Sequence, residues 1–444
     1  MKLLRLLACC SFGILSALAK DSPPADTGRP VPYRVGEWLP SDQKATDQWA
    51  KKLVDETGGQ PAPLLPAVQE LKELIEGDPE LFMLFTQMFA QVPSKRPYLN
   101  DPTGKPGVRD YVHMLHLLNS ILTKAPAFDQ TGLVGFPINA ILDWPMGTPA
   151  GSAAFLNEKV NRQLKKILNQ WALFLSSKES LSALSTDPKT GWLGRDALKA
   201  MPTLAEDFQC DPTAPFYGFS SWDDFFTRQF KEGKRPVASP EDDSVIANAC
   251  ESAPYRLVKG VKQQDLFWIK AQPYSLKYML AGDPLAGQFD GGTIYQAFLS
   301  ALSYHRWHSP VSGTIVKTRV VDGSYYAAAL SAGFDPASPN ESQAYITNVA
   351  TRAIVFIQAD NPAIGLMGLV FVGMAEVSSN EVTVKEGQHV AKGEQLGMFH
   401  FGGSTHCLLF RPQTKLKFDL HGQQPSLNSE NIKIKERIAT VEER

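Results

Sequence analysis

The spacing of apolar residues divides the chain into two parts with different periods. Between about residues 40 and 200, apolar positions recur every three or four residues, which is the period of an amphipathic helix. The longest stripe consists of Leu156, Val160, Leu164, Ile167, Trp171, Phe174 and Leu175. Shorter stripes run over 64–75 and 108–122, and a stretch rich in proline and glycine at 102–107 separates such helices. The pattern predicts a helical N-terminal domain over 41–200.

After about residue 215, short runs rich in β-branched and aromatic residues alternate with turns, as strands do. Examples are 313–317, 353–357 and 368–372. Nearer the end, a Glu-Gly pair and a Lys-Gly pair separate further short runs, which is typical of a small β-sandwich or barrel. We therefore expect an α+β protein, in which a mainly β domain over 215–444 follows the helical domain.

The first residues have the features of a targeting segment. Lys2 and Arg5 give a positive start, an apolar run follows, and Ala17-Leu18-Ala19 fits a small-x-small cleavage site. This predicts a secretory signal peptide over 1–19, with an uncleaved signal anchor as the alternative. Residues 20–40 follow as a flexible lead-in. No later stretch is long and apolar enough to cross a bilayer, so we expect a mature chain without a transmembrane segment, in the secretory pathway or secreted.

Composition narrows the function classes. The 444 residues include 44 lysines and arginines and 46 aspartates and glutamates, for a net charge of −2. Because no basic excess is available to neutralise phosphates, the chain is not expected to bind nucleic acid. Beyond the signal, three widely spaced cysteines form no CxxC pair, so no zinc site is expected.

Two histidines stand close together in a short motif, Tyr304-His305-Arg306-Trp307-His308-Ser309-Pro310. Histidine is the side chain best suited to move protons near neutral pH, so the pair is a candidate acid and base. The same His-x-x-His spacing also suits a metal site. The spacing alone leaves both interpretations open.

A second candidate is the loop Gly402-Gly403-Ser404-Thr405. The two glycines allow the backbone to bend sharply, and a serine hydroxyl beside its own upstream carbonyl is a nucleophile when a base is near. His400 and His406 flank this loop, and we interpret both as residues that pack it.

These motifs occur together, in this order, in a known family. The chain has Phe225-Phe226-Thr227-Arg228 and Arg235-Pro236, then a Tyr-His-Arg-x-His-x-Pro-x-x-Gly motif over 304–313, then the Gly-Ser-Thr site. On these motifs it resembles the pyruvoyl-dependent phosphatidylserine decarboxylases over about 215–435. The resemblance extends to a fungal branch, the L-tryptophan decarboxylases of the psilocybin pathway, through stretches such as 171–178 and 397–403. It implies that the helical domain is the extra N-terminal domain of that branch.

The resemblance implies that the chain makes its own cofactor. In the family, the serine of the Gly-Ser-Thr site attacks the preceding carbonyl, and the chain is cut there. Here the cut would fall between Gly403 and Ser404, and Ser404 would become a pyruvoyl group. Residues 404–444 would form a small chain that stays associated with the large one.

The same resemblance assigns three further roles. His308 is expected to be the base that activates Ser404, and His305 the proton donor to the substrate carbon. The acid that holds the base is usually an aspartate in the family, and Glu251 stands in its place here. The pyruvoyl group would bind a substrate amine as a Schiff base and accept electrons as CO2 leaves.

Three functions therefore remain open. The first is a self-processing decarboxylase of an amino acid, with L-tryptophan or another aromatic amino acid as substrate. The second is a phosphatidylserine decarboxylase that makes phosphatidylethanolamine in the secretory pathway, so that the partner is a phospholipid. The third rests on the histidines alone and is a metal-dependent hydrolase.

Overall fold

The computed structural model describes residues 52–53, 55, 62–92, 108, 110–128, 137–265, 274–300, 302–329, 342–376 and 379–442. All of them belong to one compact unit, Tyr33–Arg444. The expected signal peptide over 1–19 and lead-in over 20–40 lie outside the described residues.

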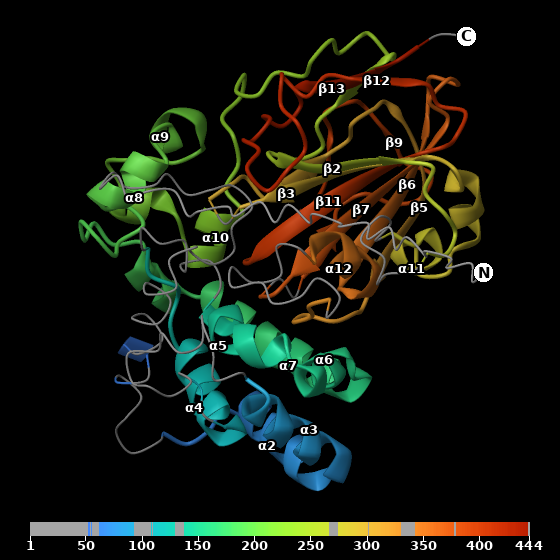
Figure 1. Cartoon of the computed structure of the whole chain (residues 1–444). Coiled ribbons are helices and arrows are strands. Elements are labelled where there is room, and N and C mark those ends of the chain that lie inside the picture. Colours follow the sequence, from blue (N-terminus) through green and yellow to red (C-terminus); the bar gives the residue numbers. More distant parts are fainter. Residues whose placement is uncertain are drawn as a thin grey trace, which may run out of the picture. The chain divides into compact units, whose positions relative to one another are not determined.

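The first part of the described chain is helical (Figure 1). Its helices are α2 (Pro66–Gly77), α3 (Pro79–Ala90), α4 (Tyr111–Ile121), α5 (Pro137–Met146), α6 (Pro149–Leu156), α7 (Glu158–Leu175), η3 (Lys178–Ala183), α8 (Arg195–Ala200) and α9 (Leu204–Asp207). The strongest predicted stripe is largely the buried face of α7, which includes Val160, Leu164, Ile167 and Trp171. Leu156 is the exception, because Asn157 caps α7 and leaves Leu156 at the end of α6, 40% exposed.

Short elements lead into the β-rich part: η4 (Pro215–Gly218) and α10 (Trp222–Phe226). The strands are β1 (Val245–Ala247), β2 (Ala253–Lys259), β3 (Thr293–Leu299), β4 (Arg306–His308), β5 (Gly313–Val321), β6 (Arg352–Ala359), β7 (Leu366–Met374), β8 (Asn380–Val382), β9 (His389–Val390), β10 (Gln395–Phe399), β11 (Gly403–Phe410), β12 (Leu416–Phe418) and β13 (Arg437–Val441). The expected α+β class, with a helical N-terminal region and a β-rich C-terminal region, is confirmed.

The strands form three antiparallel sheets. The largest has the order β2-β3-β11-β7-β6-β5-β9, and two smaller sheets have the orders β4-β10-β8 and β1-β13-β12. The predicted Glu-Gly and Lys-Gly turns lie on either side of β9, and both glycines have positive φ, 81° at Gly387 and 83° at Gly393. That backbone conformation explains why glycine stands at these turns.

Strand β11 lies inside the large sheet, between β3 and β7, and its two faces contact different apolar cores. Successive side chains of a strand point to opposite faces. Accordingly, Cys407 and Leu409 join one core, which also contains residues of α11 (Leu276–Met279), η5 (Pro284–Phe289) and α12 (Gln343–Val349). Leu408 and Phe410 join the other core, together with residues of the two smaller sheets.

The helical region contacts the sheet beside the first residues of β11. The backbone N–H groups of Ile138 and Asn139, in the first turn of α5, donate to the carboxylate of Glu376 at 2.8 and 2.9 Å. Glu376 lies two residues beyond Met374, which pairs with Gly403. The helices thus help to position the segment that contains the predicted cleavage site.

Candidate active site

Ser404 lies at the head of β11, an interior strand of the large sheet. It pairs with Leu299 of β3 on one side and Gly373 of β7 on the other. The preceding Gly402 has a φ of 135°, a conformation that favours glycine. Ser404 is fully buried, and its Oγ makes no hydrogen bond within the described part of the chain. A buried hydroxyl without a partner is unusual, although Ser404 shares this state with Ser324 and Tyr295.

His305 precedes β4 and is also fully buried. Its ring stacks on Phe226 of α10, with the ring centroids 4.0 Å apart. Among the described residues neither ring nitrogen makes a hydrogen bond. Burial, and secondarily the positive charge of Arg228, lower the pKa of His305 to about 3, although the Ser303 backbone opposes this. His305 is therefore neutral at ordinary pH.

His308 is held at both ring nitrogens. Nδ1 lies 2.7 Å from the carbonyl oxygen of Gly393, and Nε2 lies 3.0 Å from the hydroxyl of Tyr304. Because a carbonyl oxygen only accepts, Nδ1 carries the proton and Nε2 accepts from Tyr304. Burial first, and then the charges of Lys435 and Arg306, lower the pKa of His308 to about 3. The ring is thus neutral, as a base requires.

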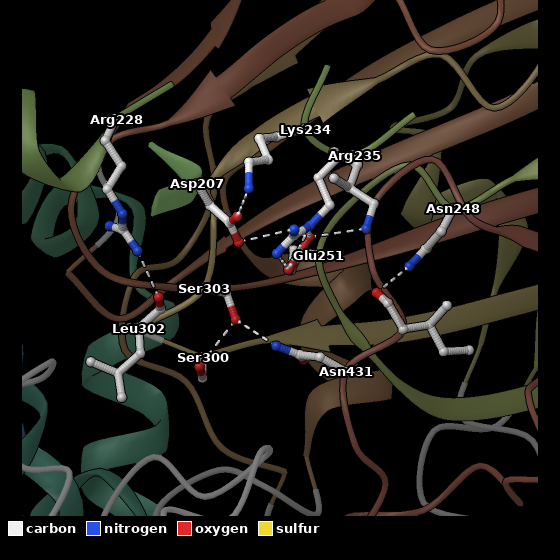
Figure 2. A network of polar contacts seen from close by, with 12 residues as sticks. Asp207, Arg228, Lys234, Arg235, Asn248, Glu251, Ser300, Leu302, Ser303 and Asn431 are labelled. Atoms are coloured by element: carbon white, nitrogen blue, oxygen red, sulfur yellow. Dashed lines mark hydrogen bonds and ion pairs between the residues drawn. The ribbon is translucent and has the colours of Figure 1, made fainter. Parts of the chain in front are cut away.

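Glu251 has different partners from the one expected (Figure 2). Nη2 of Arg235 donates to its Oε1 at 2.8 Å, and the backbone N–H of Ile434 donates to its Oε2 at 3.0 Å. Arg235 also pairs with Asp207 at 3.2 Å. The expected pairing of Glu251 with His308 is therefore replaced by an ion pair with the arginine of the Arg-Pro motif. The strongly basic guanidinium of Arg235 binds the carboxylate of Glu251, while the ring nitrogens of His308 contact Tyr304 and Gly393.

Further polar contacts fix the segment ahead of Tyr304 (Figure 2). Arg228 donates from Nη2 to the carbonyl of Leu302 at 2.8 Å. The Nδ2 of Asn431 donates to the hydroxyl of Ser303 at 3.0 Å. The Ser303 hydroxyl also lies 3.1 Å from the hydroxyl of Ser300. Arg228 comes from the Phe-Phe-x-Arg motif, so two of the sequence motifs meet here.

Some polar residues of this region were not predicted as site residues. His406 is two positions after Ser404 on the same face of β11, and it is fully buried with neither ring nitrogen hydrogen-bonded among the described residues. Asn380, which pairs with Phe399, is also buried with its amide unpartnered in the described chain. The alternation of side chains along a strand could have predicted that residues 404 and 406 share a face. The position of Asn380 follows only from the fold.

His400, interpreted above as a packing residue, makes ionic contacts. Its Nδ1 lies 3.0 Å from a carboxylate oxygen of Asp223 in α10, and its Nε2 lies 3.0 Å from Glu381 in β8. Against the effect of burial, these two carboxylates raise the pKa of His400. The contacts attach the segment before the Gly-Gly pair to two other elements.

The histidines do not assemble a metal centre in the part of the chain that the structure describes. No group of three or more histidine, cysteine, aspartate or glutamate side chains there is arranged to hold a metal ion. Within the same residues, no helix is both long and apolar enough to cross a membrane.

Comparison with known proteins agrees with these motifs. Two family models, both described as phosphatidylserine decarboxylase, match residues 65–201 and 222–439. An L-tryptophan decarboxylase of Psilocybe cubensis is 41% identical over 369 residues, covering 78% of this chain and 81% of the relative. The chain belongs to the phosphatidylserine decarboxylase family. It is a decarboxylase, a carboxy-lyase, and the metal-dependent hydrolase interpretation is set aside.

Other members of the phosphatidylserine decarboxylase family match to different extents. An L-tryptophan decarboxylase of Psilocybe cyanescens is 37% identical over 463 residues, covering 99% of this chain and 100% of the relative. Phosphatidylserine decarboxylase proenzyme 3 of Schizosaccharomyces pombe is 32% identical over 227 residues, covering 50% of this chain and 22% of that protein. The similarity to the tryptophan decarboxylases therefore includes the helical region as well as the β-rich one.

Proposed function

We propose that this decarboxylase cuts its own chain between Gly403 and Ser404 and then decarboxylates an aromatic amino acid, with L-tryptophan as the first candidate. The observation that carries the proposal is the state of Ser404, a fully buried hydroxyl without a hydrogen-bond partner among the described residues, directly after two glycines. Such a hydroxyl is poorly stabilised where it lies and adjoins the carbonyl that it would attack.

The cut needs a nucleophile and a base. The Ser404 oxygen would bond to the carbonyl carbon of Gly403 while its proton passes to Nε2 of His308, and the amide nitrogen would leave with a proton, giving an ester. Elimination would then transfer the Cα proton of residue 404 to a base and break its Cβ–O bond, which forms the Cα=Cβ bond of dehydroalanine and leaves Gly403 with a free carboxylate. Water would displace ammonia from the dehydroalanine that remains, which yields a pyruvoyl group. His308 is unprotonated at neutral pH, so its Nε2 could accept this proton once Tyr304 no longer donates to it.

The head of β11 fits a pyruvoyl group made from Ser404, because the group would replace a serine that is already buried there without a hydrogen-bond partner for its side chain among the described residues. Such a group supplies a ketone that takes the substrate amine as a Schiff base and draws electrons from the bond to the carboxylate. His305 would hold the proton for the substrate carbon. Because burial keeps His305 neutral in the uncut chain, it would have to take up a proton in the course of the reaction before it could deliver one.

An aromatic substrate is supported by the rings beside the cleavage loop. Phe401 contacts Trp171 of α7, Trp222 and Phe226, with ring centroids 5.1, 5.8 and 5.4 Å apart. Phe226 in turn stacks on His305. The names of the two Psilocybe relatives point to the same substrate class.

The second candidate is phosphatidylserine, with phosphatidylethanolamine as product. It is favoured by the description of both matching family models and by the S. pombe relative. It would agree with a location in the secretory pathway, which we propose from the residues of the first segment, such as Lys2 and Arg5.

The two pieces of the cut chain are proposed to stay together. Strand β11 would belong to the small chain, and it pairs along its length with β3 and β7 of the large chain. Separating the pieces would therefore expose the middle of the large sheet.

The first experiment is denaturing mass spectrometry of the purified protein. We expect a fragment that spans 404–444 and is lighter by one ammonia than the serine-terminated peptide, and we expect Ser404→Ala to remain uncut. Ser324→Ala, which removes another buried hydroxyl without a partner among the described residues and lies outside the motifs, serves as the matched control and should still be cut. Wild-type protein that stays whole would refute the proposal.

The second experiment identifies the substrate. Purified enzyme is incubated with L-tryptophan, L-phenylalanine, L-tyrosine, or vesicles that contain phosphatidylserine, and amine products are measured. Product from an aromatic amino acid alone supports the first candidate, whereas phosphatidylethanolamine alone would establish the second.

A further inference from the structure

We infer that Tyr304, together with the carbonyl of Gly393, orients His308 for chain cleavage, and that Glu251 acts on the attachment of the C-terminal segment instead. Tyr304 is then a positioning residue, since it would act through His308. The inference rests on the proposed function only in that His308 is taken as the base. The contacts themselves exist in the uncut chain.

The Gly393 carbonyl is a well-fixed acceptor for Nδ1 of His308. Gly393 donates from its own N–H to the carbonyl of Ser309 at 2.8 Å, and Ser309 donates back to Glu394 at 2.7 Å. The turn is therefore tied to the residue next to His308. A side chain at Gly393 is excluded by its φ of 83° and because a Cβ would come within 2.4 Å of the side chain of Val237. The carbonyl thus fixes which nitrogen carries the proton.

Tyr304 is equally well fixed. It is 4% exposed, and its ring packs against Phe230 with the centroids 4.4 Å apart. Phe230 stacks on Phe208, also at 4.4 Å. Burial raises the pKa of Tyr304 far above its usual value, so the hydroxyl keeps its proton and can donate it to Nε2 of His308. After His308 takes a proton, the same hydroxyl oxygen can rotate to accept from it.

Glu251 is connected to His308 only indirectly by the contacts described. It binds Arg235, whose guanidinium lies 4.5 Å above the ring of Phe230, which packs against Tyr304. The other oxygen of Glu251 holds the backbone of Ile434. Nearby, Asn248 donates from Nδ2 to the carbonyl of Ile432 at 2.9 Å. Glu251 therefore contributes to attaching the segment after residue 430, which would be part of the small chain.

The direct test is ¹⁵N NMR of the imidazole nitrogens in uncut Ser404→Ala protein, with the His308 signals assigned by their loss in His308→Gln. We expect Nδ1 protonated and Nε2 unprotonated from about pH 5 to 8. Adding Tyr304→Phe should shift the Nε2 signal toward that of a nitrogen without a hydrogen bond. Adding Glu251→Gln should leave it in place. Tyr295→Phe is the matched control, because it removes a buried hydroxyl that has no partner among the described residues.

These NMR measurements test the inference whether or not the chain cuts itself. A His308 that is protonated at Nε2, or that titrates in this pH range, would overturn the inference even if Tyr304→Phe failed to fold. So would a signal that moves with Glu251→Gln and not with Tyr304→Phe.

A second measurement uses chains with Ser404 intact. Tyr304→Phe should slow disappearance of the precursor about five- to tenfold, the size of one lost buried hydrogen bond, while Tyr295→Phe leaves the rate unchanged. Equal rates for these two variants would overturn the inference. A wild-type chain that never cuts would refute the proposed function and leave the NMR result standing.

Discussion

Several buried polar side chains of the helices are hydrogen-bonded, whereas two at the head of β11 are not, among the residues that the structure describes. In the helices, Asn119, Asn161 and Gln163 each donate to a backbone carbonyl, at 3.2, 2.8 and 2.8 Å. At the head of β11, Ser404 and His406 are fully buried without a hydrogen bond in the described chain. Unpaired buried groups cost stability, so two of them on one face of β11, just after the Gly-Gly pair, make this place a candidate for function. We therefore expect substitutions in the helices to change mainly stability, and substitutions near the head of β11 to change mainly the chemistry.

The largest expected effect is on the rate of chain cleavage, and it distinguishes His308 from His305. His308→Ala should accumulate uncut precursor, with a loss of rate on the order of 10³-fold or more, because no other base is expected to replace it. His305→Ala should still be cut but should lose turnover. The checks are a time course of precursor disappearance on gels and an assay of amine product on the cut fraction. Equal and complete failure of cutting in both variants would contradict this division.

Shortening a core side chain in the helical region should instead lower stability without slowing chain cleavage. Leu164→Ala removes a buried side chain of α7 and should lower the free energy of unfolding by about 2–4 kcal/mol, while the folded fraction cuts itself at the wild-type rate. Thermal unfolding and the precursor time course measure the two quantities. Slower cutting at a temperature where the variant is fully folded would show that the helices take part in the chemistry.

Glu376 lies where the two regions meet, and it should make stability depend on pH. Burial raises its pKa to about 8, although the N–H groups of Asn139 and Ile138 oppose this. Between its usual pKa and about 8, the folded protein keeps a proton that the unfolded chain has lost. Stability from this residue is therefore present at low pH and falls as the pH rises toward 8.

The test of this dependence is Glu376→Gln, which keeps an acceptor for α5 but cannot ionise. The variant should unfold at a higher temperature than wild type above pH 8, by an amount equivalent to about 1–3 kcal/mol, and the difference should shrink at pH 5.5. A difference that is constant across this pH range would mean that Glu376 does not titrate as expected.

The smallest effect is expected at the surface of the helices. Lys166 and Glu70 form an exposed ion pair at 2.6 Å, and exposed pairs contribute little because water and salt screen them. Lys166→Ala should leave both the unfolding temperature and the cutting rate unchanged within error. A clear loss of either would show that this face has a partner or a role that the contrast between the regions misses.

The sequence predicted what depends on local pattern. The stripe of α7 and the turns at Gly387 and Gly393 follow from spacing and from glycine, because local geometry decides them. The roles of His305 and His308 came from the motif and stay a prediction. The partner of Glu251 could not be predicted, because Arg235 and Ile434 meet it only after the chain has folded.

Other contacts of the site could not be predicted from the sequence for the same reason. Tyr304 stands in the recognised motif, yet nothing in the spacing says that its hydroxyl binds the ring four residues later. The separation of α6 from α7 depends on the cap at Asn157 rather than on periodicity. The predicted stripe therefore included Leu156, which belongs to α6.

The place of β11 between two other strands of its sheet has a consequence for the lifetime of the enzyme. An uncut chain that unfolds can fold again by itself, because all its strands are covalently joined. Once cut ahead of β11, the protein would yield two molecules on unfolding, and recovery would need them to find each other and insert a strand between β3 and β7. Refolding would then depend on concentration and compete with aggregation. We expect the mature enzyme to be protected by a slow rate of unfolding, and its loss to be irreversible.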